Sequence, residues 1–581
     1  MAGGLPAPSR WTPAAFPGRT LLLAVAEGAR RQARREWAGS GLHRIFLARP
    51  RPDGLAASPI DLRPADAEAA RRILAGRFTF GGSTLEAGVK GDPWDRPSPS
   101  RRFAQLLHRF DWMRDLLALG DAGADEGLRL TLEWRRTFGR WNAFSWEPDV
   151  LERRVFNLAC AARRITVRAS DAETAQIALD LVRQARHLVS LIDGPVRASE
   201  RAAAAALAGT ALSGEAGEKL VARALAKLAR TLPDTVQADG GHASRNPRAA
   251  LELLFDLSTL DEALVQRGQA APDEMMRAID RLTGAVRFFT LADGGLPDMQ
   301  GGEAGRRAYV AAARASEDAS GKIPASRNGY QRLDGRNLQV IADAAAPAKG
   351  PWSVAACAQP LAIEVLTRKR RLIVGSGWSA EAAGPQAMRL VDAASTASLG
   401  DQHCGAPLRG FRAAALGPRL TCADWSVEAQ RHETDHALWL ELSHDGWAKP
   451  FGLRHERRIF LDRDADELRG EDSFTPAAAN PLPQEEGRRF VPFMVRFHVH
   501  PDVRVSLARD GKSALLKADG DETGWRLRSD AQELAVESSV FFQDGQPKRS
   551  QQVVLRGQLR LGEGSKVRWK LAAAEAWPPP Q

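Results

Sequence analysis

The sequence predicts a two-part fold, in which an all-helical N-terminal half is followed by an antiparallel β-sandwich. Three observations lead to this prediction. The chain has 581 residues, enough for two or more domains that each bury a core. Apolar residues recur at helical spacing over about the first 320 residues. From Pro324–Gly329 onward, short alternating segments and turn pairs replace that pattern.

The helical half consists of amphipathic segments separated by turns. Arg101–Ala118 carries apolar residues at helical spacing. The same pattern recurs in Glu152–Ile165, Ala172–Ile192, Glu200–Leu212, Ala216–Leu228, Arg248–Gln266 and Pro272–Phe289. Antiparallel helical hairpins in series form a bundle, a solenoid or a closed α/α toroid. No fixed-period repeat of the solenoid kind is visible.

The C-terminal half contains short segments that alternate between apolar and polar residues or are rich in β-branched residues. The predicted strands are Leu338–Ala342, Leu361–Leu366, Arg371–Val374, Ala437–Ser443, Arg457–Asp462, Phe493–His500 and Val567–Leu571. Hairpin turns are predicted at Asp445-Gly446, Asp510-Gly511 and Asp544-Gly545. Many short strands over about 250 residues imply a β-sandwich.

Composition places the chain among ordinary globular proteins with a basic surface. The hydrophobic fraction is 44% and the charged fraction 26%, and no apolar run reaches the length of a membrane-spanning helix. The net charge of +10 would attract polyanions such as acidic glycans or nucleic acid. The sequence has no basic tail and no block of like charges, so the charge does not single out a polyanion-binding segment. A GC-rich genome would explain the number of arginines equally well.

Two further features bear on compartment and chemistry. Thr20–Ala26 is apolar and leads into Arg30, Arg31, Arg34 and Arg35, which predicts an amphipathic helix. An export signal would place its positive charges before the apolar run, whereas here the arginines follow it. The sequence therefore shows no export signal. The cysteines Cys160, Cys357, Cys404 and Cys422 are widely spaced without a C-x-x-C pair, which excludes a disulfide framework and a zinc ribbon.

The segment His432-Glu433-Thr434-Asp435-His436 matches the zinc-protease pattern H-E-x-x-H. That chemistry needs both histidines on one face of a helix, whereas the flanking residues alternate as strands do. We therefore expect a polar hairpin loop here. His498 and His500 lie two apart on a strand and share a face, but no third metal ligand is apparent. Structural hydrogen bonding is the better interpretation of that pair.

The loop Asp239–Pro247 is the strongest candidate site. It places His242, Arg245 and Asn246 just before a helix, on the kind of loop where binding residues often lie. Asn246 as N-cap and Pro247 at the first helical position explain part of the pattern, but not His242 and Arg245. A second candidate is Arg140–Trp146, before the helix that holds Arg153 and Arg154. Its Trp141 and Asn142, with Arg154, suit a sugar subsite, and core packing is the alternative.

These segments resemble the heparinase II/III-like polysaccharide lyases. The matching segments are Phe110–Leu116, Glu152–Arg154, Asp239–Pro247, Gly329–Leu333, Ser443–Gly446 and Leu468–Asp472. The resemblance runs from about Gly91 to Leu571. It implies an α/α toroid over residues 91–322 and a β-sandwich over 323–575, with a partly helical extension over 1–90 and a frayed tail over 576–581.

The resemblance implies β-elimination on a uronic-acid polysaccharide, with no redox cofactor, no metal and no nucleic-acid partner. Asn246 matches the family's Asn that neutralises the substrate carboxylate, which lets charge develop at the adjacent carbon. His242 is the candidate catalytic neighbour. Arg245, Trp141, Asn142 and Arg154 are the candidate substrate-binding residues. A family location in the cell envelope or periplasm is implied, while the missing export signal leaves the cytoplasm open.

The general base is where the sequence departs from the family pattern. The strand that usually begins with a His here begins near Cys357, and a second His is replaced within Ala394–Ala397. Only Tyr309, expected on a helix, and Tyr330, expected in the sandwich, are available as tyrosines. Two functions therefore remain open: a polysaccharide lyase, or a catalytically impaired member that binds acidic glycans at the cell envelope. A glycoside hydrolase would need paired carboxylates, and nothing pairs Asp239 with Glu147.

Overall fold

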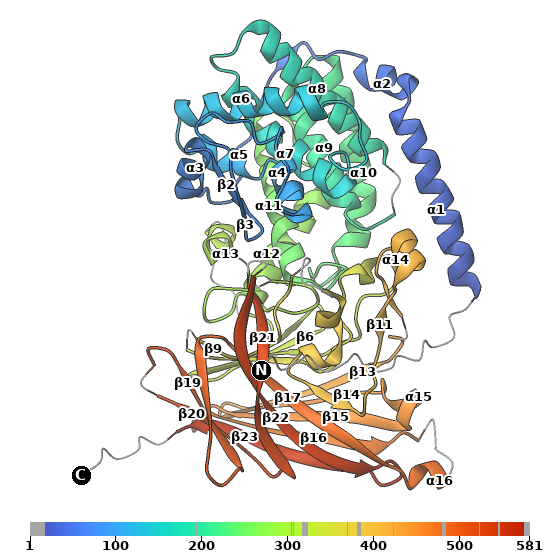
Figure 1. Ribbon diagram of the computed structural model, residues 1–581, viewed down its shortest axis with the longest axis vertical. Coiled ribbons are helices and arrows are strands. Elements are labelled where there is room, and N and C mark those ends of the chain that lie inside the picture. The colour runs from blue at the N-terminus through green and yellow to red at the C-terminus, as the bar shows by residue number, and fades with distance from the viewer. Residues whose placement is uncertain are drawn as a thin grey trace.

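The helical and β halves form two packed bodies (Figure 1). The computed structural model describes residues 18–191, 194–303, 305, 307–315, 323–368, 370–379, 385–421, 423–478, 484–521, 523–543 and 546–574. The expectations for the tail at 576–581 and for the turn Asp544-Gly545 lie outside the described residues. None of the described helices is long and apolar enough to cross a membrane.

The helical half closely follows the amphipathic segments of the sequence. Its helices are α1 (Gly18–Gly39), α2 (Gly41–Ala48), α3 (Ala67–Leu74), α4 (Arg101–His108), α5 (Trp112–Leu117), α6 (Asp121–Phe138), α7 (Pro148–Ile165), α8 (Asp171–Ser190), α9 (Ala198–Thr210), α10 (Glu215–Thr235), α11 (Pro247–Gln266), α12 (Asp273–Phe289) and α13 (Arg307–Arg314). Two short antiparallel pairs accompany them: β1 (Gly54–Leu55) pairs with the distant β4 (Leu212–Ser213), and β2 (Arg77–Phe80) forms a hairpin with β3 (Ser83–Glu86).

One predicted helix is divided in two. Arg101–Ala118 was expected to be continuous, but α4 ends at His108 and α5 begins at Trp112. Phe110 between them has a left-handed backbone (φ 61°), which a continuous helix does not allow. Its ring is fully buried in the helical core. Apolar spacing could not reveal the break, because both short helices bury residues in the same core.

Helix α9 lies at the centre of the helical half. All thirteen of its residues are buried, and it packs against α7, α8, α10 and α11. Its run of alanines lets neighbouring helices approach closely, because small side chains shorten the distance between helix axes. This packing fixes the N-terminus of α9 and therefore Glu200, which matters for the candidate site.

The C-terminal half is a sandwich of two antiparallel sheets. The first contains β5 (Ser326–Arg327), β6 (Tyr330–Asp334), β7 (Leu338–Asp343), β8 (Ile363–Thr367), β9 (Arg370–Val374), β10 (Ala397–Leu399), β17 (Phe490–Val499), β21 (Glu533–Gln543) and β22 (Gln546–Arg560). The second, in spatial order, is β13 (Val427–Glu433), β14 (Ala437–His444), β15 (Leu453–Asp462), β16 (Glu467–Pro476), β23 (Ser565–Ala573), β20 (Trp525–Ser529), β19 (Ser513–Ala518) and β18 (Val503–Leu507). Their apolar faces share one core.

Short elements connect these strands. They are the helices α14 (Gly410–Leu416), α15 (Ala448–Phe451) and α16 (Gln484–Gly487), the 3-10 turns η1 (Gly350–Val354), η2 (Pro385–Arg389) and η3 (Val391–Ala393), and the pair β11 (Ala406–Pro407) and β12 (Leu420–Thr421). Asp510-Gly511 is the predicted hairpin turn, with Gly511 at φ 63°. Asp445-Gly446 is not a tight hairpin, because α15 forms part of that connection.

Two contacts tie the halves together at the periphery. Helix α1 runs along the side of the molecule to α14 of the sandwich (Figure 1), where Ala24 packs against Leu408, Ala415 and Leu416. The long ribbon of β21 and β22 reaches toward the helical half (Figure 1). There the β2–β3 turn lies against the Gln546 side chain, so closely that a Cβ at Gly82 would overlap it.

Candidate functional site

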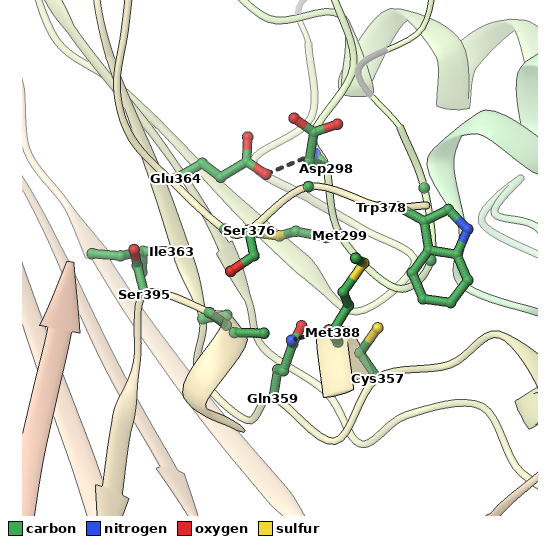
Figure 2. Close-up of a pocket in the computed structure, with 17 residues that line it drawn as sticks. Asp298, Met299, Cys357, Gln359, Ile363, Glu364, Ser376, Trp378, Met388 and Ser395 are labelled. Carbon is green, nitrogen blue, oxygen red and sulfur yellow. Dashed lines mark hydrogen bonds between the residues drawn. The ribbon is translucent and has the colours of Figure 1, made fainter. Parts of the chain in front are cut away.

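A small pocket lies where the helical half meets the sandwich, and it contains the positions at which the sequence departs from the lyase pattern (Figure 2). Its residues come from the loop after α12 and from the sandwich: Asp298, Met299, Gly301, Gly302, Cys357, Gln359, Ala362, Ile363, Glu364, Gly375, Ser376, Gly377, Trp378, Met388, Ala393, Ala394 and Ser395. The cavity volume is about 20 Å³, which holds about one water molecule. None of these lining residues is a His, Tyr, Lys or Arg.

Cys357 occupies the place where an imidazole base was expected. Its side chain is 3% exposed, and burial raises the pKa of the thiol to about 11. The thiol is therefore protonated near neutral pH and cannot act as a base. The backbone N–H of Cys357 donates to Gln300 Oε1 at 2.9 Å, which attaches this loop to the helical half.

Two other polar side chains of the pocket, Ser395 and Gln359, are hydrogen-bonded to the protein. Ser395, within the second segment that lacks the family His, donates to the Val374 carbonyl at 2.6 Å and accepts the His498 backbone N–H at 2.9 Å. Gln359 donates to the carbonyls of Met388 and Leu390 at 2.8 and 3.0 Å. These bonds stabilise the wall of the pocket, and neither side chain is directed to a ligand.

Glu364 is a buried acid in the wall of the pocket. Its carboxylate accepts the Asp298 backbone N–H at 2.7 Å, as Figure 2 shows, and lies 3.5 Å from the Arg371 guanidinium. Burial raises its pKa to about 8, although Arg371 acts in the opposite direction. Arg371 also pairs with Asp293 and Asp298 at 2.9 and 3.0 Å. The cluster thus holds three carboxyl groups around one guanidinium, and Glu364 is largely protonated near pH 7.

The loop before α11 forms a second, separate cluster around His242. Its Nδ1 is 2.7 Å from the Ser244 hydroxyl and accepts the Ser244 backbone N–H at 3.2 Å. Its Nε2 lies 3.6 Å from Glu200 Oε1 at the start of α9. Burial would raise the pKa of Glu200, but the His242 contact and the Arg197 charge lower it to about 2. His242 is 4% exposed, and its ring packs edge-on against Trp352.

Arg245 has a structural role in place of the predicted substrate contact. Its guanidinium donates to the carbonyls of Asn328, Gly329, Ala345 and Ala346 and to the Asp343 carboxylate. These bonds engage Nε and both terminal nitrogens, and the group stacks on the Tyr330 ring at 4.8 Å. The backbone of Arg245 is left-handed (φ 59°). Arg245 therefore fastens the loop to the sandwich and presents no donor to a substrate.

Asn246 caps helix α11. Its Oδ1 accepts the backbone N–H groups of Arg248 and Ala249 at 2.9 and 3.3 Å, as an N-cap does. Its carbonyl oxygen is thereby committed to the helix, and Gly302 lies directly beside it. Among the described residues, the amide Nδ2 has no hydrogen-bond partner, so only that half of the side chain remains for a ligand.

The remaining predicted subsite residues make separate contacts within the helical half. Arg154 is fully buried, donates to Gln184 and the His108 carbonyl, and stacks on Trp134 at 4.4 Å. Asn142 caps its own turn by accepting the N–H groups of residues 144 and 145. Trp141 packs half-buried on the helical core. No contact joins these three side chains to the loop of Asn246 in the described part of the chain.

Neither tyrosine reaches the pocket. Tyr330, in β6, is fully buried and donates its hydroxyl to the Arg245 carbonyl at 2.8 Å, and burial holds its pKa well above the usual value. Tyr309, on α13 as expected, accepts a hydrogen bond from Arg114 at 2.8 Å. Both phenols are thus occupied by structural contacts.

The histidine motifs of the sandwich are structural. His432 and Glu433 end strand β13 and His436 lies in the following turn, which confirms the predicted hairpin. His498 bonds through both ring nitrogens, to Ser539 and to the Asp392 carbonyl, and burial lowers its pKa to about 4. Among the described residues, no group of three or more His, Cys, Asp or Glu could hold a metal ion.

The segments Ser443–Gly446 and Leu468–Asp472, two of those that carry the resemblance, meet inside the sandwich. His444 lies 3.1 Å from His455, and His455 lies 2.8 Å from the Asp472 carboxylate. Asp472 also accepts from Arg457 at 2.7 Å and from Trp569 at 2.9 Å. Burial raises the pKa of Asp472, but Arg457 and His455 hold it well below its usual range. These motifs therefore stabilise the core.

Comparison with known proteins identifies the family. A family model described as heparinase II/III-like, C-terminal, matches residues 320–570. FtsZ-localized protein C of Caulobacter vibrioides is 51% identical over 577 residues, which cover 99% of this chain and 100% of that protein. The chain belongs to the heparinase II/III-like family.

Solved structures of heparinase II/III-like enzymes share this fold. A crystal structure of heparinase III covers 96% of this chain and 94% of its own, with a TM-score of 0.66 and 13% identity. A mutant of the heparan sulfate lyase HepC from Pedobacter heparinus covers 97% and 92%, with a TM-score of 0.58 and 15% identity. The predicted order of a helical toroid and a β-sandwich is confirmed. At these identities the likeness concerns the fold alone.

Sequence reasoning missed the acidic cluster of this heparinase II/III-like chain. Glu364 is an acid inside the buried apolar strand β8, and Arg371 lies on the next strand, β9, so the sequence contained a sign of this pair. A charged residue in such a strand is expected to have a buried partner. Asp293 and Asp298 gave no such signal, because they lie on a loop whose position against β9 depends on the tertiary structure.

Proposed function

We propose that this protein is a catalytically silent heparinase II/III-like protein that acts by binding, and that it localises with FtsZ. The observation that carries the first part is the pocket of about 20 Å³ around Cys357, Glu364 and Ser395. A lyase site must hold a sugar ring beside a base that is ionised for proton abstraction. Here the volume suits about one water, and the thiol and the carboxyl group are both largely protonated near pH 7.

The proposed localisation with FtsZ rests on a similar protein of Caulobacter vibrioides. A protein that is 51% identical over essentially the whole of both chains bears the name FtsZ-localized protein C. Such identity supports similar surfaces as well as a similar fold. A fluorescent fusion expressed in the native bacterium together with labelled FtsZ tests this part, and the expected result is coincident localisation. A diffuse distribution that ignores FtsZ would contradict it.

Activity is tested with a panel of uronic-acid polysaccharides. Elimination creates an unsaturated sugar whose ultraviolet absorbance rises with each cleavage, and the expected result is no rise with any member of the panel. The competing lyase mechanism, with Asn246 neutralising the carboxylate, predicts a rise that Asn246→Ala abolishes. An absorbance rise that depends on Asn246 would therefore overturn the catalytically silent assignment.

Binding of the same polysaccharides, measured by calorimetry, separates two kinds of silent protein. Saturable binding without cleavage would support the acidic-glycan-binding function implied by the family resemblance. Absence of binding would restrict the protein to protein or lipid partners. The net charge of +10 makes salt dependence essential, because non-specific attraction weakens steeply with ionic strength.

A second candidate function, attachment to a membrane surface, is favoured by the exposed apolar side chains of α1 and α2. Eight of the nineteen large exposed hydrophobics of the described chain lie there: Leu21, Leu22, Leu23, Val25, Trp37, Leu42, Ile45 and Phe46. Arg30, Arg31, Arg34 and Arg35 follow on α1. An apolar stretch beside arginines is the pattern of a helix that lies in an anionic lipid surface.

Sedimentation with vesicles tests the membrane attachment. We expect binding to vesicles that contain anionic lipid and loss of at least about tenfold in affinity when Leu22 and Phe46 are both changed to Ser. Val167→Ser, at an exposed apolar residue away from the patch, is the matched control. Equal binding by all three proteins would refute the role of α1 and α2.

A further inference from the structure

The outer face of the second sheet carries a groove that the interdomain pocket does not explain. It crosses β14, β15, β16, β23 and β20, on the side opposite the sandwich core. Its volume is about 580 Å³, far larger than the interdomain pocket. The groove is lined by Trp439, Arg458, Ile459, Phe460, Arg469, Gly470, Glu471, Arg528, Ser529, Asp530, Arg568, Trp569 and Lys570.

The strand register orders this lining into a row. Trp439 pairs with Phe460, Phe460 with Arg469, Arg469 with Lys570, and Lys570 with Arg528. Paired residues on adjacent strands share a face, so these five side chains cross the sheet in sequence. The row begins with two aromatic rings and ends with three cations. A groove with this polarity distinguishes the two ends of a ligand.

The aromatic end forms a corner. Trp439 is 44% exposed, although its size would favour burial in a protein without a partner on this face. Its ring meets the Phe460 ring nearly at right angles, with centroids 5.6 Å apart. The two rings are thus in edge-to-face contact, and a compact apolar side chain fits the angle that they form, whereas stacking of a sugar ring favours one flat exposed ring.

The cationic end is incompletely neutralised. Glu467 pairs with both Arg469 and Lys570, and Glu471 pairs with both Arg458 and Arg568, so each carboxylate serves two cations. Glu441 adds a 3.8 Å contact to Arg458, and Asp530 accepts the Arg568 backbone N–H. Arg528 has no carboxylate partner among the described residues.

The outer face of the whole second sheet also carries a net positive charge. Its outward positions carry ten cations, Arg454, Arg458, Arg469, Arg504, Lys517, Arg526, Arg528, Lys566, Arg568 and Lys570. They also carry six acids, Glu428, Glu441, Glu456, Asp462, Glu467 and Glu471. The excess of four positive charges favours an anionic partner over a basic or neutral one.

We infer that this groove binds an extended acidic peptide segment of a partner protein, with an apolar side chain in the Trp439–Phe460 corner and carboxylates on Arg469, Lys570 and Arg528. Four strand spacings separate β14 from β20, which gives a length of about 19 Å, or about six extended residues. A uniformly anionic polysaccharide matches the aromatic corner less well. This inference does not depend on the absence of lyase activity or on the partner being FtsZ.

The test uses a panel of fluorescein-labelled ten-residue peptides and the full-length protein. Each peptide places Phe or Leu two to four residues before three consecutive Glu or Asp residues. The comparison probes have the apolar residue replaced by Gly or the acids replaced by Gln, and heparin serves as a polysaccharide probe. We expect saturable anisotropy changes with at least one peptide of the panel and at least tenfold weaker binding of both comparison peptides.

Variants locate the interaction. Trp439→Ala and the double change Lys570→Glu with Arg528→Glu should each weaken peptide binding at least tenfold, while circular dichroism shows an unchanged fold. Arg504→Glu, on the same face but outside the groove, is the matched charge control and should change binding less than twofold. No saturable binding by any peptide, or equal weakening by Arg504→Glu, would overturn the inference. Heparin binding that competes with the peptide and is indifferent to Trp439→Ala would also overturn it, in favour of a general polyanion surface.

Discussion

Arg245→Ala tests whether the loop before α11 is a binding loop or a fastening between the two halves. The wild-type guanidinium makes hydrogen bonds to four sandwich carbonyls and an ion pair with Asp343, which is 2% exposed. Removal of the Arg245 side chain leaves the Asp343 carboxylate buried, with Gln300 as its principal remaining hydrogen-bond donor. Loss of one partner of a buried pair costs about 3–5 kcal/mol, so we expect destabilisation of about 4 kcal/mol.

The assay is urea unfolding followed by circular dichroism and by tryptophan fluorescence. Arg245→Lys preserves the charge but cannot reach all the carbonyls that the planar fork reaches, so its loss should be intermediate, about 2 kcal/mol. Arg230→Ala, at an exposed arginine of α10, is the matched control and should change stability by less than about 0.5 kcal/mol. A loss below about 1 kcal/mol for Arg245→Ala would refute the fastening role, and weakened ligand binding in a variant of full stability would restore the substrate-binding prediction.

Three further perturbations follow from the buried groups. Asp472→Ala should destabilise the sandwich by about 3–5 kcal/mol, because it leaves Arg457 buried without its carboxylate; denaturant titration of the full chain measures this. Glu364 has a folded pKa of about 8, above that of the unfolded chain, so the folded state binds the extra proton and stability falls as pH rises from about 5 to 8. Glu364→Gln should flatten this pH dependence in thermal unfolding, and an unchanged slope would contradict the cause. Asn246→Ala should cost about 1 kcal/mol through loss of the helix cap, while Asn246→Asp should keep the stability within about 0.5 kcal/mol; equal losses in both would show that capping is not the reason.

Much of the fold was predictable because it depends on local periodicity. The segments from Glu152 to Phe289 became helices α7 to α12, since their apolar spacing, caps and breaks agree. Their ends shift by at most four residues, except that α10 continues seven residues past the predicted end at Leu228. The strands around Leu338, Ile363 and Phe493 were likewise visible as apolar or alternating runs. The break at Phe110 was not visible, because a left-handed residue with a buried ring preserves the apolar pattern on both sides.

The candidate site was only partly predictable. The loop Asp239–Pro247 was predicted to carry binding residues, and in the structure its histidine and arginine contact Glu200 and the sandwich. The N-cap role of Asn246 was anticipated from Asn-Pro alone. Trp141, Asn142 and Arg154 carried the right chemistry for a sugar subsite, yet whether such side chains face a cleft or the core depends on how the helices pack.

The sequence by itself determined the division into a helical half and a β half, since periods of 3.6 and 2 are properties of consecutive residues. Its resemblance to the lyases also predicted where the family's histidines are replaced, near Cys357 and within Ala394–Ala397. The tertiary structure alone decided that the intervening pocket holds about one water, that Arg245 is saturated, and that Glu364 is largely protonated near pH 7. Volume, hydrogen-bond saturation and desolvation arise from residues far apart in the chain, so no local pattern encodes them.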